Sequence, residues 1–505
     1  LPMAPRSLVV HGHFYQPPRE DPRTGRGPSG TDWNGQITEQ CYAANADAPI
    51  MNDSGEIIDR VNNYAWMSFN FGPTLLSWIE ERAPALLEKI VAADRASVAR
   101  LGHGNAIAQA YSHAILPLCN VRDLKTEIRW GMDDFRLRFG RQAEGMWLPE
   151  TACSDRVLEA LAAAGLRFAL LAPRQAAAVR ARGDGTAPWE DRQGGTIDTR
   201  FAYHWRSPYS DRSIALYFYD GGIARAIAFD GALHDSANLV DRIQDAAGQG
   251  SAADAGVLVH AATDGESYGH HFRYGERCLA YALTREAPAR DFFISNYGRH
   301  LTDHPPTHEA RIVAGGSSWS CEHGVERWFR NCGCVTGEQP GDDQGWRGPL
   351  RDAMDGLRDA AAQYADDVGA RWGVDLWALR DGDRAHRVDP SMRHDWLAQS
   401  CDHLDASERE RVHADIETVL AMQRSALAMY TSCGWFFSDI AGIEARIVLR
   451  HAASVCATLA LTLGDDLVTR RFEEQLRYAK SHRAGFATGA DVFRAIEQEN
   501  LQHRG

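Results

Sequence analysis

Long apolar runs are what this sequence of 505 residues most clearly lacks. No run approaches the roughly 20 residues that a bilayer-spanning helix needs, so the sequence predicts no membrane span. The N-terminal stretch "LPMAPRSLVVHGHF" also lacks the extended apolar core of a secretory signal and passes directly into a strand-like run. Together these absences favour a mature soluble chain.

Positive charge and cysteine are also in short supply. The chain has 54 Lys and Arg against 68 Asp and Glu, a formal net charge of −14, and no basic run. This balance disfavours nucleic acids and anionic membranes as partners and leaves uncharged polymers such as sugars open. The 10 cysteines are scattered, unlike the dense framework of a small secreted scaffold. A reducing cytoplasm is therefore the expected location.

Several common catalytic signatures are missing as well. The sequence has no Walker-type phosphate loop and no dinucleotide fingerprint following a strand. The G-x-S-x-G elbow of esterases is absent too. The chemistry must therefore lie in other residue patterns.

Strand-like and helix-like segments alternate as far as about residue 300. Strand-like runs lie at 7–15, 97–104, 141–150, 168–173, 213–220 and 256–266, and helix-like segments include 72–97 and 154–165. Ser154 is the expected N-cap of the second of these helices, and Gly165 is its expected C-terminal stop. Such alternation predicts an α/β domain with a parallel sheet.

The character of the chain changes after residue 300, and this change suggests its domains. We expect a catalytic barrel over 1–310 and an α-helical domain over 349–505. Between them, residues 311–348 form an irregular Cys- and Trp-rich connection that contributes to the active-site rim. A length of 505 residues also favours two or more domains.

Polar residues gather at the C-terminal ends of the predicted strands. They are His11, His13, His103, Asn105, Glu150, Asp264 and Glu266. In a parallel barrel these strand ends meet at one rim, and that rim carries the active site. The sequence therefore predicts a site built from several strands.

Glu150 ends the stretch "GMWLPE" and has apolar neighbours. Burial there would disfavour the charged form of the carboxylate. Pro149 fixes the local backbone, and Trp147 could form a wall for a flat ligand. The alternative is a glutamate that only caps the following helix.

Asp264 and Glu266, in "ATDGESYGHH", supply further carboxylates at the end of an apolar strand. Gly265 and Gly269 indicate a tight turn that re-aims them. Two carboxylates from different strands on one rim are what glycoside hydrolysis needs, one as nucleophile or base and the other as proton donor. The alternative is a solvated Asp-Gly turn.

Two groups of residues resemble metal sites, and the first consists of histidines. His300, His304 and His308 are spaced as on one helix face. The Pro pair at 305–306 breaks that helix, which argues against a metal there.

The second group is Cys321, His323, Cys332 and Cys334. This C-x-H…C-x-C set could hold zinc, although its one-residue spacing is tighter than the usual C-x₂-C knuckle. Otherwise these residues order a loop, with the thiols packed as small hydrophobes.

Five stretches carry a resemblance to a known family. In order, "HGHFYQPP", "YSHAILPL", "GMWLPE", "ATDGESYGHH" and "SSWSCEHG" resemble five sequence regions of glycoside hydrolase family 57. The likeness is greatest to a bacterial branch with an additional C-terminal domain of unassigned function. It runs in register from residue 7 to at least 324, and "WFFSDIAGIE" at 435–444 resembles that branch's C-terminal part.

The resemblance implies an incomplete (β/α)₇ barrel followed by an α-helical bundle domain. It also implies a retaining enzyme that acts on α-glucosidic bonds, with no cofactor and no obligatory metal. By the same resemblance Glu150 is the nucleophile and Asp264 the general acid/base. Substrate-binding roles fall on His11, His13, His113, Trp147, Glu266, His270, Trp319 and His323.

The leading interpretation is a retaining glycosidase that cleaves an α-glucan or oligosaccharide through a covalent glycosyl-enzyme. A 4-α-glucanotransferase or a branching enzyme would use the same intermediate. A metal-dependent polysaccharide deacetylase would need a His-x₃-His pair, which occurs only around Pro305. A catalytically inactive carbohydrate-binding protein would not need the two carboxylates.

Overall fold

The computed structural model describes residues 6–27, 32–52, 54–183, 185–248, 256–336 and 343–502. The chain forms two compact units. The first comprises Leu1–Gln16, Gly30–Ala110 and Phe135–Trp319, and the second comprises Pro17–Ser29, Tyr111–Asp134 and Ser320–Gly505. Two segments from the first half of the sequence therefore group with the C-terminal helices, which no single cut along the chain describes.

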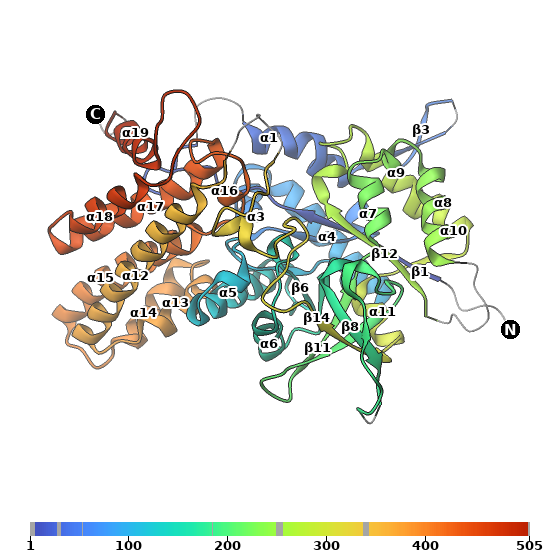
Figure 1. Ribbon diagram of the computed structural model, residues 1–505, viewed down its shortest axis with the longest axis horizontal. Coiled ribbons are helices and arrows are strands. Elements are labelled where there is room, and N and C mark those ends of the chain that lie inside the picture. The colour runs from blue at the N-terminus through green and yellow to red at the C-terminus, as the bar shows by residue number, and fades with distance from the viewer. Residues whose placement is uncertain are drawn as a thin grey trace. The chain divides into compact units, whose positions relative to one another are not determined.

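The first unit contains a ring of parallel strands. Around the ring they are β12 (Leu258–Asp264), β1 (Arg6–Phe14), β4 (Ser68–Phe71), β5 (Ala108–Gln109), β6 (Gly145–Trp147), β7 (Phe168–Leu171) and β11 (Ser213–Phe218). Figure 1 shows β1 and β12 side by side. Between β11 and β12 the described residues form no ladder, only a hydrogen bond from Asp220 N to His260 O (2.8 Å). The predicted incomplete (β/α)₇ barrel is confirmed.

Helices connect the barrel strands and cover them with their apolar faces. They are α3 (Pro73–Arg82), α4 (Pro84–Leu101), α6 (Asp155–Ala163), α7 (Gly221–Ala228), α8 (Ser236–Ala247), α9 (Gly275–Tyr281) and α11 (Tyr297–Asp303). Helix α5 (Val121–Phe139) follows β5 in the chain, but its residues as far as Asp134 belong to the second unit. The helix expected over 72–97 is divided at Pro84, since proline lacks the N–H that a continuous helix requires. The strand expected over 97–104 is wrong, because α4 continues through Leu101.

The short helix α6 shows how local sequence sets its two ends. Ser154 occupies the N-cap position with extended backbone, but its side chain makes no capping hydrogen bond. Gly165 has a φ of +83°. That left-handed backbone allows Leu166 N to donate to Leu161 O (3.1 Å) and closes the helix end, as predicted.

Further strands extend the sheet beyond β11. They are β10 (Ala202–Arg206), β14 (His308–Ile312), β8 (Ala176–Ala181) and β9 (Glu190–Asp191). The strand β13 (Phe292–Ile294) pairs with the start of β1, and β2 (Ala48–Met51) forms a hairpin with β3 (Ile57–Val61). The remaining helices before β2 are α1 (Trp33–Ile37) and α2 (Ala43–Asn45), and α10 (Ala287–Ala289) precedes β13.

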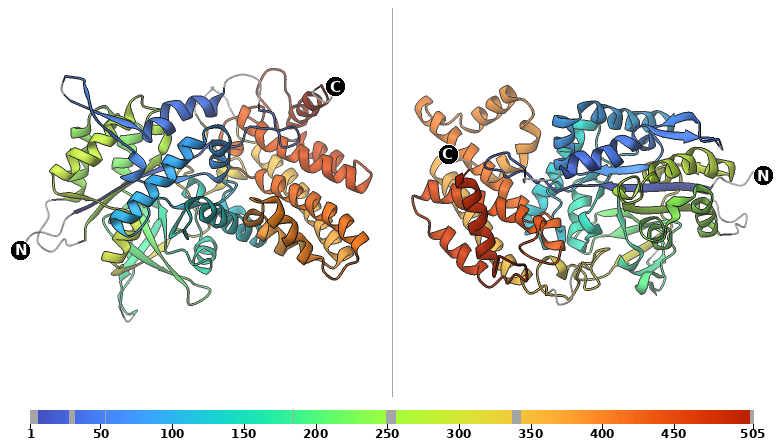
Figure 2. Two further views of the ribbon diagram at one scale, coloured as in Figure 1. Left: turned by 180° about the vertical axis from the view of Figure 1, so that it is seen from behind. Right: turned by 90° about the horizontal axis from the view of Figure 1, so that it is seen from above.

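The second unit is largely a bundle of helices, in agreement with the predicted helical C-terminal region. They are α12 (Arg347–Trp372), α13 (Leu376–His386), α14 (Pro390–Ser400), α15 (Ala406–Ala428), α16 (Cys433–Phe436), α17 (Ile443–Leu463), α18 (Leu467–Leu476) and α19 (Gly489–Gln502). The helices α12, α15 and α17 pack on one another (Figures 1 and 2). Their buried faces supply the core of this unit.

Helix α17 is long and apolar enough to cross a membrane by length and composition, which corrects the expectation from the sequence. Its most apolar window has a mean hydropathy of 1.3 and is 50% buried inside the structure. Buried core helices of soluble proteins meet the same criterion. Because α17 packs against α12, α15, α18 and α19, we describe it as a core helix of the bundle.

Candidate active site

The carboxyl ends of the barrel strands place several polar side chains at one level of the rim. In the parallel ladders, His13 of β1 pairs with Asp264 of β12 on one side and with Asn70 of β4 on the other. Trp147 ends β6, and Glu150 follows three residues later. The predicted rim is therefore present, with side chains from separate strands.

His103 and Asn105 do not belong to this rim, which corrects the sequence-based expectation. They precede Ala106, which forms a parallel bridge with Phe69 of β4 just before β5 begins. His103 Nδ1 bonds Glu144 (2.9 Å), a residue that comes before β6. Both residues therefore lie toward the amino ends of the strands.

Asn70 connects the two histidines of β1. Its Oδ1 lies 3.0 Å from His11 Nε2, and its Nδ2 lies 2.9 Å from both His13 Nδ1 and Gln109 Oε1. Burial lowers the pKa of His11 to about 3, so its ring is neutral and donates from Nε2. Since the Asn70 amide nitrogen can only donate, His13 accepts at Nδ1 and carries its ring proton on Nε2. This network fixes the orientation of both rings.

Trp147 forms a buried wall beside these rings. Its indole lies against His13 at a centroid distance of 4.7 Å and an interplanar angle of 16°, and against His11 at 5.1 Å and 14°. The indole Nε1 has no hydrogen-bond partner among the described residues. An unpaired buried N–H costs about 1–3 kcal/mol, a cost that a ligand or water oxygen at that position would remove.

Glu150 lies on a turn with unusual backbone geometry. After Pro149, both Glu150 and Thr151 have left-handed backbone, with φ of +58° and +49°. Trp319 holds this turn twice: its backbone N donates to Glu150 O (2.9 Å), and its indole Nε1 donates to Glu150 Oε2 (2.8 Å). Left-handed backbone costs a non-glycine residue roughly 1–3 kcal/mol, so the surrounding contacts must maintain it. The indole bond favours the ionised carboxylate.

Asp264 is in a different electrostatic state. Protein atoms crowd around its carboxyl group and raise its pKa well above the usual range, and the negative charges of Glu266 and Glu150 raise it further. The side chain is nevertheless open to water, and solvent screening limits this effect in the ligand-free protein. A bound substrate that excluded water would strengthen it.

The two carboxyl groups are thus close enough for the charge of Glu150 to raise the pKa of Asp264. Glu150 accepts a hydrogen bond that stabilises its anion, whereas Asp264 retains its proton more readily. Environments that separate two carboxyl groups in this way supply a nucleophile and a general acid at the same pH. The alternative that Glu150 only caps the next helix is not supported, because Glu150 Oε2 accepts from Trp319.

Glu266 and His270 hold neighbouring loops. Glu266 is 3% exposed, and its Oε1 accepts hydrogen bonds from Tyr42 Oη (2.6 Å) and Tyr15 N (3.2 Å). Burial raises the pKa of Glu266 to about 7. His270 Nδ1 lies 2.8 Å from Gln40 Oε1. Their substrate-binding roles stay predictions, and these contacts indicate that Glu266 positions the chain after β1.

His113 and His323 belong to the second unit. His113 is buried, has a φ of +57°, and its Nδ1 lies 2.6 Å from Ser432 Oγ. His323 lies among cysteines, with its Nδ1 3.5 Å from Cys334 Sγ. Substrate-binding roles for these two histidines also stay predictions.

Residues that the sequence did not single out complete the rim. Asn70 and Gln109 form the amide network described above, and Tyr219 follows β11. Burial raises the pKa of Tyr219, with Asp264 contributing, and its ring meets Trp319 edge-on at 6.5 Å. The short strands "SFNF" and "AQ" carry too little periodicity to be recognised, but Tyr219 in "SIALYFYD" stands at a predicted strand end and could have been found.

The two groups of candidate metal ligands differ in how their side chains are arranged. Both ring nitrogens of His300 have partners within the protein, Tyr217 Oη (3.0 Å) and Gly256 O (3.1 Å). In the described part of the chain, the one group of three or more metal-binding side chains is Cys321, His323, Cys332 and Cys334.

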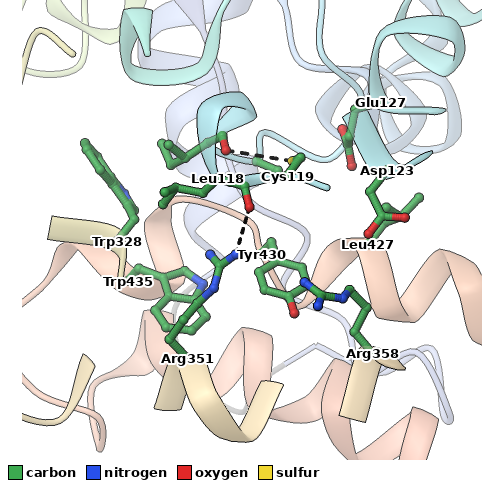
Figure 3. A pocket seen from close by; sticks show the side chains of 12 residues that line it. Leu118, Cys119, Asp123, Glu127, Trp328, Arg351, Arg358, Leu427, Tyr430 and Trp435 are labelled. Carbon is green, nitrogen blue, oxygen red and sulfur yellow. Dashed lines mark hydrogen bonds between the residues drawn. The ribbon is translucent and has the colours of Figure 1, made fainter. Parts of the chain in front are cut away.

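A small cavity lies within the second unit (Figure 3). Arg351 and Arg358 of α12 and the ring of Tyr430 face Asp123 and Glu127 of α5. Its volume of about 10 Å³ suits a single water rather than a sugar. The barrel rim therefore remains the candidate active site.

Two family models match this chain, one over its first part and one over its C-terminal part. The family model described as Glycosyl hydrolase family 57 matches residues 23–296, and a domain of unknown function, DUF3536, matches residues 343–502. No curated protein sequence matches this chain.

Solved structures share the fold at low sequence identity. An exo-type maltose-forming amylase from Pyrococcus sp. ST04 is similar with a TM-score of 0.67 and 14% identity, over 97% of this chain and 88% of that one. A GH57-type branching enzyme from Pyrococcus horikoshii gives 0.56 and 11%, over 99% and 95%. A 4-alpha-glucanotransferase from Thermococcus litoralis gives 0.53 and 11%, over 91% and 60%. These similarities establish the fold.

Proposed function

Because this chain belongs to glycosyl hydrolase family 57, we propose that it is a retaining α-glycosidase acting on an α-glucan or related oligosaccharide. The observation that carries this proposal is the pairing of Glu150, which accepts from Trp319, with Asp264, whose pKa is raised partly by Glu150 itself. The carbohydrate substrate follows from the family, and its sugar and linkage are part of the proposal.

In the proposed mechanism Glu150 attacks the anomeric carbon and forms a covalent glycosyl-enzyme. Asp264 first donates its proton to the leaving oxygen and then accepts a proton from the incoming water. Trp147 and His11 are 0% exposed and stack with one another, and Trp147 also stacks on the His13 ring at the strand end; contacts of these three residues with the sugar stay a prediction. Activity then requires ionised Glu150 and protonated Asp264, which predicts a bell-shaped pH dependence of kcat/KM.

The test is azide rescue of alanine variants on an activated aryl α-maltoside. Glu150→Ala and Asp264→Ala should each lose at least about 10³-fold in kcat. Azide should restore turnover in both. Glu150→Ala should yield a glycosyl azide of inverted anomeric configuration, because azide takes the place of the nucleophile. Asp264→Ala should yield the retained configuration, because azide attacks the glycosyl-enzyme.

The control is Glu144→Gln, which alters a carboxylate before β6 that bonds His103 and Arg167. It should retain kcat, although its stability is reduced. Retained configuration from the Glu150 variant, or full activity in either alanine variant, would contradict the proposed roles.

Transfer of the glycosyl group to a sugar hydroxyl is the second candidate. Structures described as a branching enzyme and a 4-alpha-glucanotransferase share this fold, which supports considering it. Incubation with a single maltooligosaccharide distinguishes the two reactions. Longer or branched products indicate transfer, whereas only shorter ones indicate hydrolysis.

A cytoplasmic location is also part of the proposal. The ten cysteines are thiols rather than disulfides, as in a reducing compartment. Fractionation of cells that express the full-length protein tests this location.

A further inference from the structure

Four potential metal ligands of the second unit converge after the end of the barrel. Cys321, His323, Cys332 and Cys334 place their ligand atoms within 4.8 Å of one another. Cys321 Sγ lies 4.0 Å from Cys332 Sγ and 3.9 Å from Cys334 Sγ, and Cys334 Sγ lies 3.5 Å from His323 Nδ1. The three cysteine thiols have no role in the proposed sugar chemistry.

These separations are those of a tetrahedral zinc site. With Zn–S bonds of about 2.3 Å and Zn–N bonds of about 2.0 Å, tetrahedral geometry puts two sulfurs about 3.8 Å apart and a sulfur and a nitrogen about 3.5 Å apart. A disulfide would instead require sulfurs about 2.0 Å apart. The spacing therefore fits a shared central ion and does not fit a disulfide.

Gly333 explains how a one-residue spacing can serve a single ion. It separates Cys332 from Cys334 and has a φ of +81°, a left-handed backbone that glycine adopts without strain. This turn directs both flanking side chains toward the same point. The tight C-x-C spacing is thereby compatible with zinc.

Backbone N–H groups also point at the sulfur atoms. Those of His323 and Arg327 donate to Cys321, and that of Glu322 donates to Cys334. Such donors stabilise thiolates, the form in which cysteine binds metals.

Two buried arginines belong to the same unit as the cluster. Arg347 is 0% exposed and Arg327 is 6% exposed, and neither forms an ion pair with a carboxylate in the described ranges. Arg347 Nη1 donates to Cys334 O (3.2 Å). A zinc ion with three thiolates carries a net charge of −1 and would balance a buried guanidinium.

We propose that Cys321, His323, Cys332 and Cys334 bind one zinc ion in a structural site. Four protein ligands complete the tetrahedron and leave no open position for substrate or water, which is the arrangement of structural rather than catalytic zinc. The ion would fix the irregular chain between Cys321 and Cys334, a segment with little regular structure. It is independent of the glycosidase proposal.

Metal analysis of the full-length protein tests the site. Protein purified from zinc-supplemented cells should contain about one zinc per chain by plasma mass spectrometry. Cys332→Ser and Cys334→Ser should lose the ion, while Cys278→Ser, at a half-buried cysteine outside the cluster, should keep it. Cobalt exchanged into the wild type should show the visible absorption of tetrahedral Co²⁺ bound to thiolate.

Variants of His323 distinguish a ligand from a sugar contact. His323→Ala should weaken zinc binding by more than about 100-fold, since loss of even an outer-sphere partner costs 10–100-fold. His323→Cys supplies a fourth thiolate and should retain the ion. The proposal is overturned if the reduced wild type takes up no more zinc than Cys332→Ser, or if the isolated protein contains a disulfide within the cluster. It is also overturned if both His323 variants keep zinc equally well.

Discussion

At the scale of single residues, the candidate site depends on how one carboxylate is held. Trp319 contributes a backbone and an indole donor to Glu150, and neither contact can be inferred from the 169 residues that separate them in sequence. The sequence identified both residues through the family resemblance but not their contact. Only the folded barrel brings the chain after β14 back to the turn after β6.

Trp319→Phe tests the indole donor. The substitution keeps an aromatic ring and the backbone N–H but removes a hydrogen bond to a charged oxygen, a loss of roughly 1.5–3 kcal/mol. We expect kcat/KM to fall about 10-fold or more, and the acidic limb of its pH profile to move to higher pH because the Glu150 anion is less stabilised.

A matched control is available in the same unit. Trp205 is buried and its Nε1 donates to Asp155 Oδ1 (2.9 Å) rather than to Glu150. Trp205→Phe should lower the thermal midpoint without moving the pH profile. An unchanged acidic limb in Trp319→Phe would show that the indole does not stabilise the anion.

At the scale of elements, local sequence decided where helices end more reliably than where strands begin. Pro84 separates α3 from α4, and Gly165 ends α6, because both residues restrict or permit backbone angles by themselves. The short strands β4 and β5 depend on pairing with distant neighbours. Such strands have no strong local pattern.

Two glycine substitutions with opposite expected signs test this reasoning. Gly165 has left-handed backbone and open space where a Cβ would lie, so Gly165→Ala should lower the free energy of unfolding by about 1 kcal/mol through strain alone. Gly356 lies exposed inside helix α12, also with open space, so Gly356→Ala should raise it by about 0.5–1 kcal/mol. Chemical denaturation followed by circular dichroism measures both, and effects of equal sign would contradict the argument.

At the scale of the whole molecule, each unit buries a carboxyl group away from its ordinary environment. Burial raises the pKa to about 7 for Glu266 in the first unit and for Glu127 in the second, from an ordinary 4.5. The folded state therefore binds protons more tightly than the unfolded state between these values. The resulting stability is complete below about pH 4.5 and is lost as the pH rises through about 7.

Glu266→Gln and Glu127→Gln should each flatten the pH dependence of stability over this range. A neutral amide removes the proton linkage, which contributes roughly 1–3 kcal/mol per group. Unfolding measured from pH 4.5 to pH 8 gives the slopes. Glu88→Gln, on the exposed face of α4, is the control and should leave the slope unchanged. Unchanged slopes in the two buried variants would contradict the proton linkage.

The sequence by itself determined the fold class and predicted the two catalytic carboxylates, because parallel strands end in polar residues and the family motifs are contiguous in the chain. Backbone preference and the alternation of buried and exposed positions depend on residues that are close in sequence, so a contiguous stretch is enough to predict them. The tertiary structure alone decided the contacts at the rim: the Asn70 network that orients His11 and His13, and the two hydrogen bonds from Trp319 to Glu150. It also assigned segments 17–29 and 111–134 to the second unit and brought four metal-binding side chains to one point. These are contacts between residues far apart in the chain, and their energies exist only once folding has brought the partners together.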